Sequence, residues 1–286
     1  MWRFYAMALL SLLLATPDSW SRDRHFSFWS DNPQPFLDAI KNSAEQPLPE
    51  LPAGQRVCGG IVTHHFLASG LMVRFFAGLQ GQASPETIVL VGPNHFHQGL
   101  ANISISSLPW KTPFGVVQTD GQWVQKIGAA IQLPEDPEAF SGEHSVGVLI
   151  PFLKYYFPQS RVVPVLIDVN AQIYDLGRLR TVLSTLLKNP NTLLLLSMDF
   201  SHDSVAAVAD ARDTETQEVI SSMDASKTNG LHVDCRKGLW LVLESLKLAG
   251  CDRVQFNEHT NSARLTRNPD QPNVTSYFTI HFLESK

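Results

Sequence analysis

The sequence predicts an α/β fold in which helices cover both faces of a mostly parallel central sheet. From about residue 56 onward, short apolar runs alternate with longer segments of helical periodicity, the pattern of parallel strands joined by helices. The run at 192–197 is continuously apolar, as expected for a strand that is buried on both faces. A chain of 286 residues, of which 44% are hydrophobic, is long enough to bury a large core as one α/β unit.

Six segments have the composition of strands. The segment at 87–91 is strongly β-branched and stops at Gly92-Pro93, a dipeptide that favours a break in regular structure. The segment at 161–167 has an apolar middle, which indicates a strand that crosses the core. In chain order, the expected strands are 57–63, 87–91, 102–106, 161–167, 192–197 and 277–282.

Segments with helical periodicity fill the intervals between these strands. The one at 143–157 begins with a helix start signal, because Ser141 can cap it and acidic Glu143 lies in its first turn. In chain order, the expected helices are 68–79, 121–131, 143–157, 173–187, 203–225 and 235–249.

The first residues differ from the rest. One positive charge at Arg3 precedes an apolar run at 4–15, and a polar segment at 16–19 follows, which are the parts of a secretory signal. The run is shorter than the roughly 20 apolar residues that a membrane-spanning helix needs. We expect a signal peptide at 1–20, an N-terminal arm with a short helix and a Pro-rich linker at 21–54, and the α/β domain at 55–286. The protein is then exported to the periplasm or outside the cell, and is cytoplasmic if the signal is not real.

Charge and cysteine content narrow the functional classes. The net charge is -5 and no basic stripe is visible, which disfavours a nucleic-acid partner. Three cysteines allow at most one disulfide and leave at least one thiol, which could be buried, reactive or a metal ligand. For Cys58 and Cys251 the default expectation is that of small buried hydrophobes.

Histidines follow three of the expected strands directly. His64-His65 follows the first strand, His95 follows the second, and Asp199 and His202 follow the strand at 192–197. The carboxyl ends of strands in an open α/β sheet form the edge where ligands bind, so these side chains are expected to share one pocket. Imidazoles suit Fe, Zn or Cu, and a carboxylate or thiolate commonly completes such a site.

Two further segments add candidates for this pocket. Asp199 could bind the metal or orient a histidine, and His202 could act as a general base. Glu143 could cap its helix or face the pocket, whereas its neighbour His144 is expected in the pocket. Cys235 starts the helix at 235–249, where the helix N-terminus lowers a thiol pKa and favours the thiolate that binds metal.

Taken in order, these motifs resemble the Memo family, also called AmmeMemoRadiSam system protein B. The resemblance extends from about residue 56 to the end of the chain. The segments that carry it are Gly60 to His64, Val91 to His95, Glu143 to Ser145, Leu149 to Leu153, Ser197 to His202, Asp234-Cys235, Asn261-Ser262 and Val274 to Tyr277.

The resemblance implies a fold similar to class III extradiol dioxygenases, which hold non-haem Fe(II). It implies that His64, His95 and Cys235 are the metal ligands, and that His202 is the catalytic histidine with Asp199 beside it. The family usually has Pro-His-Ala-Gly-Tyr after its first strand, where this chain has Thr63-His64-His65-Phe66-Leu67. Because that loop is one residue shorter, His65 remains an alternative to His64 as a ligand.

The resulting expectation is a metal-dependent, dioxygenase-like oxidoreductase that holds Fe(II), with Cu or Zn as alternatives. His202 would move a proton and His144 would hydrogen-bond the substrate, which the sequence does not name. One alternative is a non-catalytic pocket that binds a peptide or a small anionic ligand, and another is hydrolysis by a metal-activated water. The family name further implies association with radical-SAM and AMMECR-type proteins.

Overall fold

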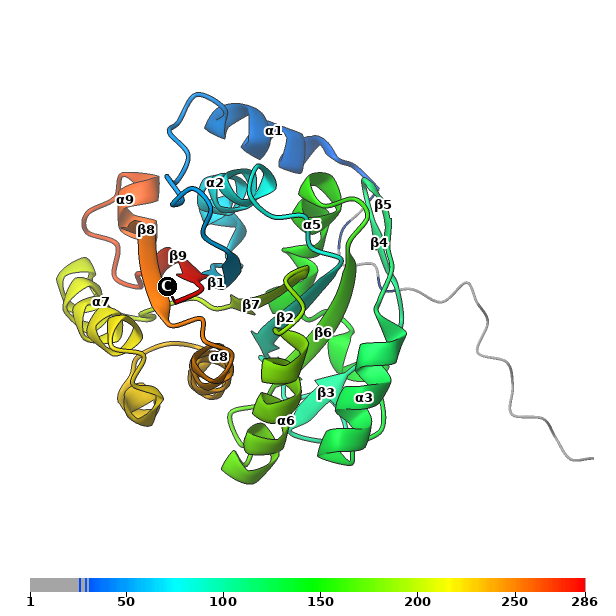
Figure 1. The fold of residues 1–286 in the computed structure, drawn as a ribbon. Coiled ribbons are helices and arrows are strands. Elements are labelled where there is room, and N and C mark those ends of the chain that lie inside the picture. Colours follow the sequence, from blue (N-terminus) through cyan, green and yellow to red (C-terminus); the bar gives the residue numbers. More distant parts are fainter. Residues whose placement is uncertain (1–25, 27–28, 30, 286) are drawn as a thin grey trace, which may run out of the picture.

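The computed structural model describes residues 26, 29 and 31–285, so the signal peptide expected at 1–20 lies outside the described residues. A seven-stranded sheet with the order β3-β6-β2-β7-β1-β9-β8 forms the centre of this part of the chain (Figure 1). The four strands β6, β2, β7 and β1 are parallel, and antiparallel strands complete both edges. The predicted α/β class with a mostly parallel sheet is therefore confirmed.

The bounds of the strands agree closely with those expected for the central four. The sheet contains β1 (Val57–Val62), β2 (Thr87–Pro93), β3 (Ile103–Ile105), β6 (Arg161–Ile167), β7 (Thr192–Ser197), β8 (Arg253–Asn261) and β9 (Ser276–Leu283). A separate two-stranded sheet pairs β4 (Trp110–Thr112) with β5 (Gly115–Val117).

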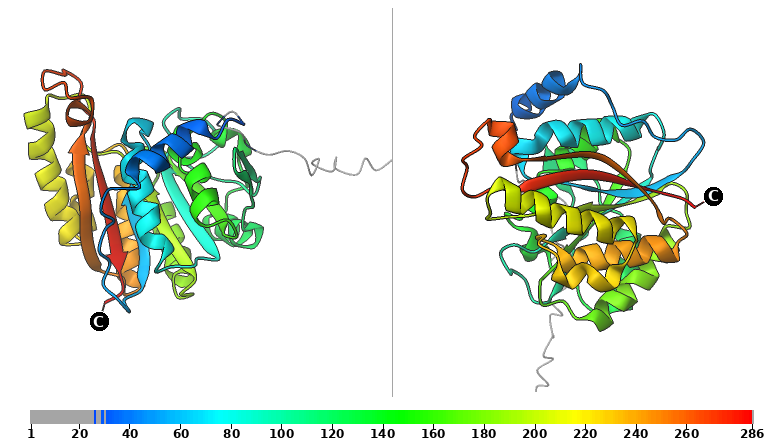
Figure 2. Two further views of the ribbon diagram at one scale, coloured as in Figure 1. Left: turned by 90° about the horizontal axis from the view of Figure 1, so that it is seen from above. Right: turned by 90° about the vertical axis from the view of Figure 1, so that its left-hand side faces the viewer.

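Helices form a layer on each side of the sheet (Figure 2). Those of the described residues are α1 (Gln34–Ser43), α2 (Ser69–Gln80), α3 (Gly121–Ile131), α4 (His144–Gly147), α5 (Ile150–Tyr156), α6 (Ile173–Leu186), α7 (Ala206–Ser221), α8 (Arg236–Leu248) and α9 (Ser262–Thr266). Helices α2 and α5 pack together on one face with α1 outside them, whereas α3, α6 and α8 pack on the other. Helix α7 lies against β8 and β9.

Alternate side chains of each central strand enter different cores. In β2, Ile88 and Leu90 belong to the core under α2 and α5, whereas Val89 and Val91 belong to the core under α6 and α8. All four side chains are at most 1% exposed. Because successive side chains of a strand point to opposite faces, burial on both faces accounts for the continuously apolar runs in the sequence.

Among the segments that differ from the sequence prediction, three have a clear physical reason. The helix expected at 143–157 is divided into α4 and α5, and Pro151 lies in the first turn of α5, where its missing N–H does not interrupt the helix. The helix expected at 203–225 ends at Ser221, and a 3-10 helix, η3 (Ala225–Gly230), follows it. Strand β8 was not predicted, because an edge strand with a partly exposed face has many polar residues.

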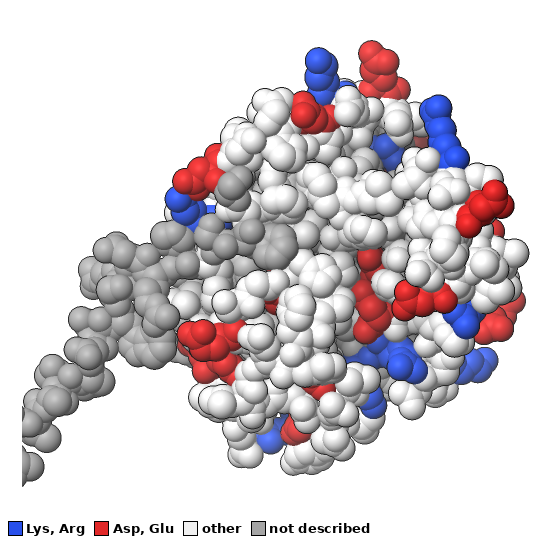
Figure 3. All heavy atoms as spheres, turned by 180° about the vertical axis from the view of Figure 1, so that it is seen from behind, with Lys and Arg blue, Asp and Glu red and all other residues white. Residues whose placement is uncertain are grey.

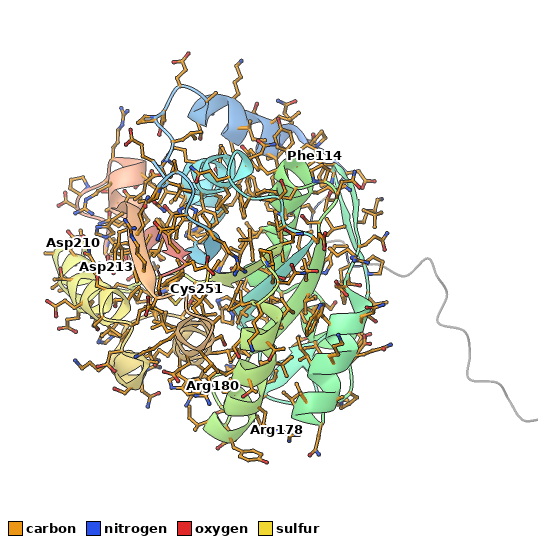
Figure 4. The ribbon with its side chains drawn as sticks, in the orientation of Figure 1. Phe114, Arg178, Arg180, Asp210, Asp213 and Cys251 are labelled. Atoms are coloured by element: carbon orange, nitrogen blue, oxygen red, sulfur yellow. A yellow bond between two sulfur atoms is a disulfide. The ribbon has the colours of Figure 1, made fainter. Side chains whose placement is uncertain are left out.

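A disulfide joins Cys58 in β1 to Cys251, which lies in the turn between α8 and β8 (Figure 4). Both cysteines are fully buried, as expected for small apolar residues, and they form the one disulfide that three cysteines allow. Cys235 is left as a free thiol. Within the described residues, every helix is too short or too polar to span a membrane.

Candidate metal centre

Three histidines meet at the carboxyl edge of the sheet. His64 follows β1, His95 follows β2, and His144 opens α4. One ring nitrogen from each lies within 4.8 Å of the others, which makes them a group that could hold a metal ion. The ring centroids of His64 and His95 are 5.1 Å apart, and those of His95 and His144 are 4.2 Å apart. Segments up to 80 residues apart therefore supply one donor cluster, in which His64 and His95 follow strand ends and His144 opens a helix.

A serine hydroxyl fixes the orientation of the His64 ring. Nδ1 of His64 lies 3.0 Å from Oγ of Ser197, and that hydroxyl donates its own proton to the carbonyl oxygen of Ser145. Ser197 must therefore accept a hydrogen bond from Nδ1–H, so the neutral ring keeps the lone pair of Nε2 free. This second hydrogen bond is the arrangement typical of a histidine that binds metal through Nε2.

A buried glutamate does the same for His95. Nδ1 of His95 donates to Oε1 of Glu143 at 2.8 Å, and the backbone N–H of His95 donates to Oε2 at 2.9 Å. Burial would raise the pKa of Glu143, but hydrogen bonds from His95 and Ser145 outweigh it and lower that pKa to about 2. Glu143 also caps α4 by accepting from the N–H of Ser145, so its two expected roles are compatible.

Two of the three rings, those of His95 and His144, differ in their affinity for protons. Burial would lower the pKa of His95, but the carboxylates of Asp234 and Glu143 outweigh it and raise that pKa to about 9. Burial lowers the pKa of His144 to about 4, and the neighbouring His64 and His95 lower it further. His144 is thus a neutral donor at neutral pH, whereas a metal at His95 has to displace a proton.

Asp234 brings a carboxylate between the first two histidines. Its Oδ2 lies 3.3 Å from Nε2 of His64 and 3.7 Å from Nε2 of His95. The same oxygen accepts a hydrogen bond from the backbone N–H of Asp199 at 3.1 Å, which fixes the carboxylate in place. Oδ1 of Asp234 is buried and has no hydrogen-bond partner among the described residues. A buried carboxylate oxygen without a partner indicates that a cation or a donor belongs beside it.

Asp199 holds the end of β1 to the end of β7. Its Oδ1 accepts hydrogen bonds from the hydroxyl of Thr63 and from the backbone N–H of His64. Its Oδ2 lies 3.9 Å from Nε2 of His64, and the group His64, Asp199 and Asp234 could also hold a metal ion. Asp199 is 3% exposed, so it contributes both to the electrostatics of the site and to the position of His64.

Cys235, an expected ligand, lies outside both of these donor groups. Its side chain is 3% exposed and belongs to the hydrophobic core under α6 and α8. Burial raises the pKa of the Cys235 thiol, and the negative charge of Asp234 raises it further. The helix N-terminus was expected to favour a thiolate, but burial has the larger and opposite effect. Asp234, the residue before Cys235, lies beside His64 and His95 instead.

The remaining expected residues lie beside the cluster. The hydroxyl of Tyr277 in β9 lies 2.6 Å from Nδ1 of His65, which holds that ring outside the donor groups found in the described chain. Of the two adjacent histidines, His64 is therefore the one that joins the cluster. His202 is half-buried in the segment between β7 and α7, close enough to lower the pKa of His65. It belongs to neither donor group of the described residues, and the proton transfer expected of it stays a prediction.

Three residues of this site were not predicted from the sequence. Asp234 was noted only as the neighbour of Cys235, and Ser197 and Tyr277 only as parts of motifs. Position could have indicated Asp234, because a carboxylate before a helix at the ligand-binding edge has the same access as the following thiol. The contact between Tyr277 and His65 could not have been found, because it joins residues 212 positions apart.

Other features of the described residues do not belong to this metal centre. Asp210 and Asp213 of α7 form a third group with His259 (Figure 4), but Arg264 pairs with Asp210, and His259 itself with Asp213. A hollow of about 710 Å³ lies at the opposite edge of the sheet, near the start of β2 and β6. In the face that Figure 3 shows, basic and acidic side chains are interspersed and form no broad patch of one sign.

Comparison with known proteins identifies the family of this chain. The family model described as Memo-like protein matches residues 26–281. A MEMO1 family protein of Aquifex aeolicus is 31% identical over 211 residues, which cover 70% of this chain and 76% of that protein. A MEMO1 family protein of Caldivirga maquilingensis is 31% identical over 176 residues, which cover 60% of this chain and 58% of that protein. One from Pyrobaculum arsenaticum is 33% identical over 156 residues, which cover 52% of this chain and 54% of that protein. The matched regions thus span little more than half of the latter two relatives. The chain belongs to the Memo-like family.

Proposed function

We propose that this protein holds one transition-metal ion, foremost Fe(II), through His64, His95 and Asp234, and that it acts there as an oxidoreductase. The observation that carries the proposal is the position of Oδ2 of Asp234 between the Nε2 atoms of the two histidines. Two donors bound to one ion at about 2.1 Å and at right angles lie about 3 Å apart. The observed separations of 3.3 and 3.7 Å are close to that value for these two pairs of donors.

The type of donor supports iron. Two histidines and one carboxylate on one side of an ion are typical of non-haem Fe(II) oxygenases, and Cu or Zn remain alternatives with these ligands. When bound, the iron supplies open coordination positions at which oxygen and a substrate can react. The buried, unpartnered Oδ1 of Asp234 supports a cation in this place.

The protein's own residues would perform three tasks. Ser197 and Glu143 orient the two ligand histidines, so the site is preorganised. His144 is neutral and 36% exposed in its side chain, so it can hydrogen-bond a substrate beside the ion. His202, in the segment between β7 and α7, would transfer the proton that such a reaction needs.

Metal analysis of single variants tests the ligand set. We expect about one Fe per chain in the wild type, a loss of iron in Asp234→Asn and His95→Ala, and retention in Cys235→Ser. The matched comparison is between Asp234 and Cys235, which are neighbours in sequence but differ in what they face. If Cys235→Ser lost the metal and Asp234→Asn kept it, the thiolate ligand set implied by the family resemblance would be correct instead.

The alternative is a pocket that binds its ligand without turnover. The small cavity of about 170 Å³ beside Asp234 would serve a binding protein equally well. Oxygen uptake by the iron-loaded protein, measured with a panel of phenols and hydroxy acids, separates the two. An enzyme consumes oxygen with at least one substrate, whereas a binding protein is only stabilised against heat by its ligand.

We also propose that the protein works in an oxidising compartment, outside the cytoplasm. The disulfide between Cys58 and Cys251 supports this, because such bonds persist mainly in exported proteins. A fusion to alkaline phosphatase, which is active only after export, tests the proposal, with a fusion that lacks residues 1–20 as its control. Equal activity of the two fusions would contradict it.

A further inference from the structure

The loops that follow β2 and β6 present apolar side chains to solvent beside the candidate metal centre. Phe96 in the first loop is 53% exposed, and Val169 in the second is 54% exposed. The two strands are parallel neighbours, and Nδ1 of His97 lies 2.6 Å from Oδ2 of Asp168, so the two loops are held together. Single apolar side chains on a surface are ordinary, but these two lie on joined loops at the border of a polar site.

Both side chains lie next to groups of that site. The ring centroid of Phe96 is 6.0 Å from that of His144, one of the three clustered histidines. Val169 lines the cavity of about 170 Å³ that Asp234 also lines. We call Phe96 and Val169 the apolar rim, and it borders the metal centre on the side of His144 and Asp234.

The chain around the apolar rim carries little formal charge. Residues 57–73, 94–110 and 169–174 contain no Asp, Glu, Lys or Arg. These stretches include the loop after β1, the loop after β2 and all but the first residue of the loop after β6. Figure 3 shows the face at which the parallel strands end, and uncharged residues cover a broad part of it. A charged group bound over these stretches would lose hydration without gaining a partner of opposite charge.

The cavity beside the apolar rim has no excess of either charge. Two cations, Arg236 and Lys237, and two carboxylates, Asp168 and Asp234, line it together. Their formal charges cancel, so the lining selects neither an anion nor a cation. A ligand that extends from the metal position over Val169 therefore gains mainly by burying apolar surface.

We infer that the substrate of the proposed oxidoreductase is an uncharged amphipathic molecule, with a polar head at the metal and an apolar tail on the apolar rim. The head would meet His144, whose ring lies beside both the other clustered histidines and Phe96. The tail would cover apolar surface that water now contacts, which is favourable in proportion to the area covered. The inference rests on the proposed function, because the head binds at the metal.

Hydroxamates of increasing chain length test the tail separately from the head. The hydroxamate group binds iron and is the same in every probe, from acetohydroxamate to octanohydroxamate. In calorimetric titrations of the full, iron-loaded chain, affinity should rise about two- to fourfold per added methylene, since a fully buried methylene corresponds to about fourfold. Suberic acid monohydroxamate has the length of octanohydroxamate but ends in a carboxylate, and it should bind at least about tenfold more weakly than octanohydroxamate.

A variant of the apolar rim tests where the tail binds. The gain in affinity from acetohydroxamate to octanohydroxamate is measured within each variant, so any change at the head cancels. Phe96→Ser should reduce this gain at least about fivefold, because it removes most of the apolar surface that the ring offers. The matched control is Leu248→Ser, which changes a side chain that is 58% exposed at the end of α8, and it should keep the full gain.

Three outcomes would overturn the inference. They are an affinity that does not depend on chain length, equal binding of octanohydroxamate and suberic acid monohydroxamate, and a full gain in Phe96→Ser. Iron content is measured on the same samples. An iron-loaded protein that binds acetohydroxamate but gains nothing from longer chains removes this inference alone, whereas a wild type that holds no iron removes the proposed function and this inference with it.

Discussion

Removal of the disulfide should lower the stability of this protein by several kcal/mol without changing its metal site. Cys58 and Cys251 are separated by 193 positions, so in the unfolded chain the bond closes a loop that contains most of the domain. The chain-entropy relation for a closed loop of that length gives about 5 kcal/mol at 25 °C. Measured effects are commonly smaller than this relation predicts, so we expect a loss of about 2 to 5 kcal/mol.

The assay is urea unfolding of the wild type with and without reductant, together with the double variant Cys58→Ala/Cys251→Ala. Reduction keeps both buried sulfurs in place, so it separates the loss of the bond from the loss of side-chain volume. The variant Cys235→Ala is the control, because it removes the free thiol and should stay sensitive to reductant.

Thiol titration in denaturant gives an independent measurement. Without reductant the unfolded wild type should expose one thiol, that of Cys235, and after reduction all three cysteines should react. Three reactive thiols before reduction, or an unfolding curve that reductant does not shift, would refute the reasoning. Either result would also remove the support that the disulfide gives to export.

Three further changes test the site and the sheet. Because His95 has a pKa of about 9 in the metal-free protein, metal binding below that pH releases a proton. The affinity for the metal, measured by competition with a chelator, should therefore rise up to about tenfold per pH unit between about pH 7 and 9 and then level off. Glu143→Gln should weaken metal binding by about 10- to 100-fold in the same assay, because Glu143 orients His95. The control Glu215→Gln, on the exposed side of α7, should bind metal like the wild type. Equal metal affinities of Glu143→Gln and the wild type would contradict the orienting role. In urea unfolding, Gly59→Ala should destabilise by more than about 3 kcal/mol, because a Cβ there would lie 2.0 Å from the carbonyl oxygen of Leu194 in β7. Gly177→Ala in α6, where a Cβ meets nothing within 4 Å, should instead stabilise by about 0.5 to 1 kcal/mol, so a stable Gly59→Ala would show that β1 and β7 can separate.

The central sheet could be predicted because its strands are buried on both faces. Strands such as β2 and β7 have continuous apolar centres, Ile88 to Val91 and Leu193 to Leu196, that are buried on both faces. Edge strand β8 could not be predicted from the same signal, since its exposed and half-buried positions admit polar residues. The meeting of His64 and His95 could be predicted from the strand ends alone, because parallel strands deliver their carboxyl ends to one edge.

The choice between Asp234 and Cys235 could not be made from the sequence. Both residues precede α8 at the ligand-binding edge, and both side chains are chemically able to bind iron. Which of the two side chains faces the histidines depends on the backbone conformation of the segment that precedes α8. The N–H of Asp199 binds Oδ2 of Asp234, and the N–H of Asp234 binds the carbonyl oxygen of Asp199 at 3.3 Å.

These reciprocal hydrogen bonds fix which of the two neighbours faces the histidines. With Asp234 held against the end of β7, the thiol of Cys235 is directed to the core, close to Gly238, where a Cβ would lie 2.4 Å from its sulfur. Exchanging the two side chains would bury a carboxylate among apolar residues, which is strongly unfavourable unless a cation accompanies it. The double exchange Asp234→Cys/Cys235→Asp should therefore lose both stability and iron, and a double variant as stable as the wild type that kept its iron would contradict this placement of the two side chains.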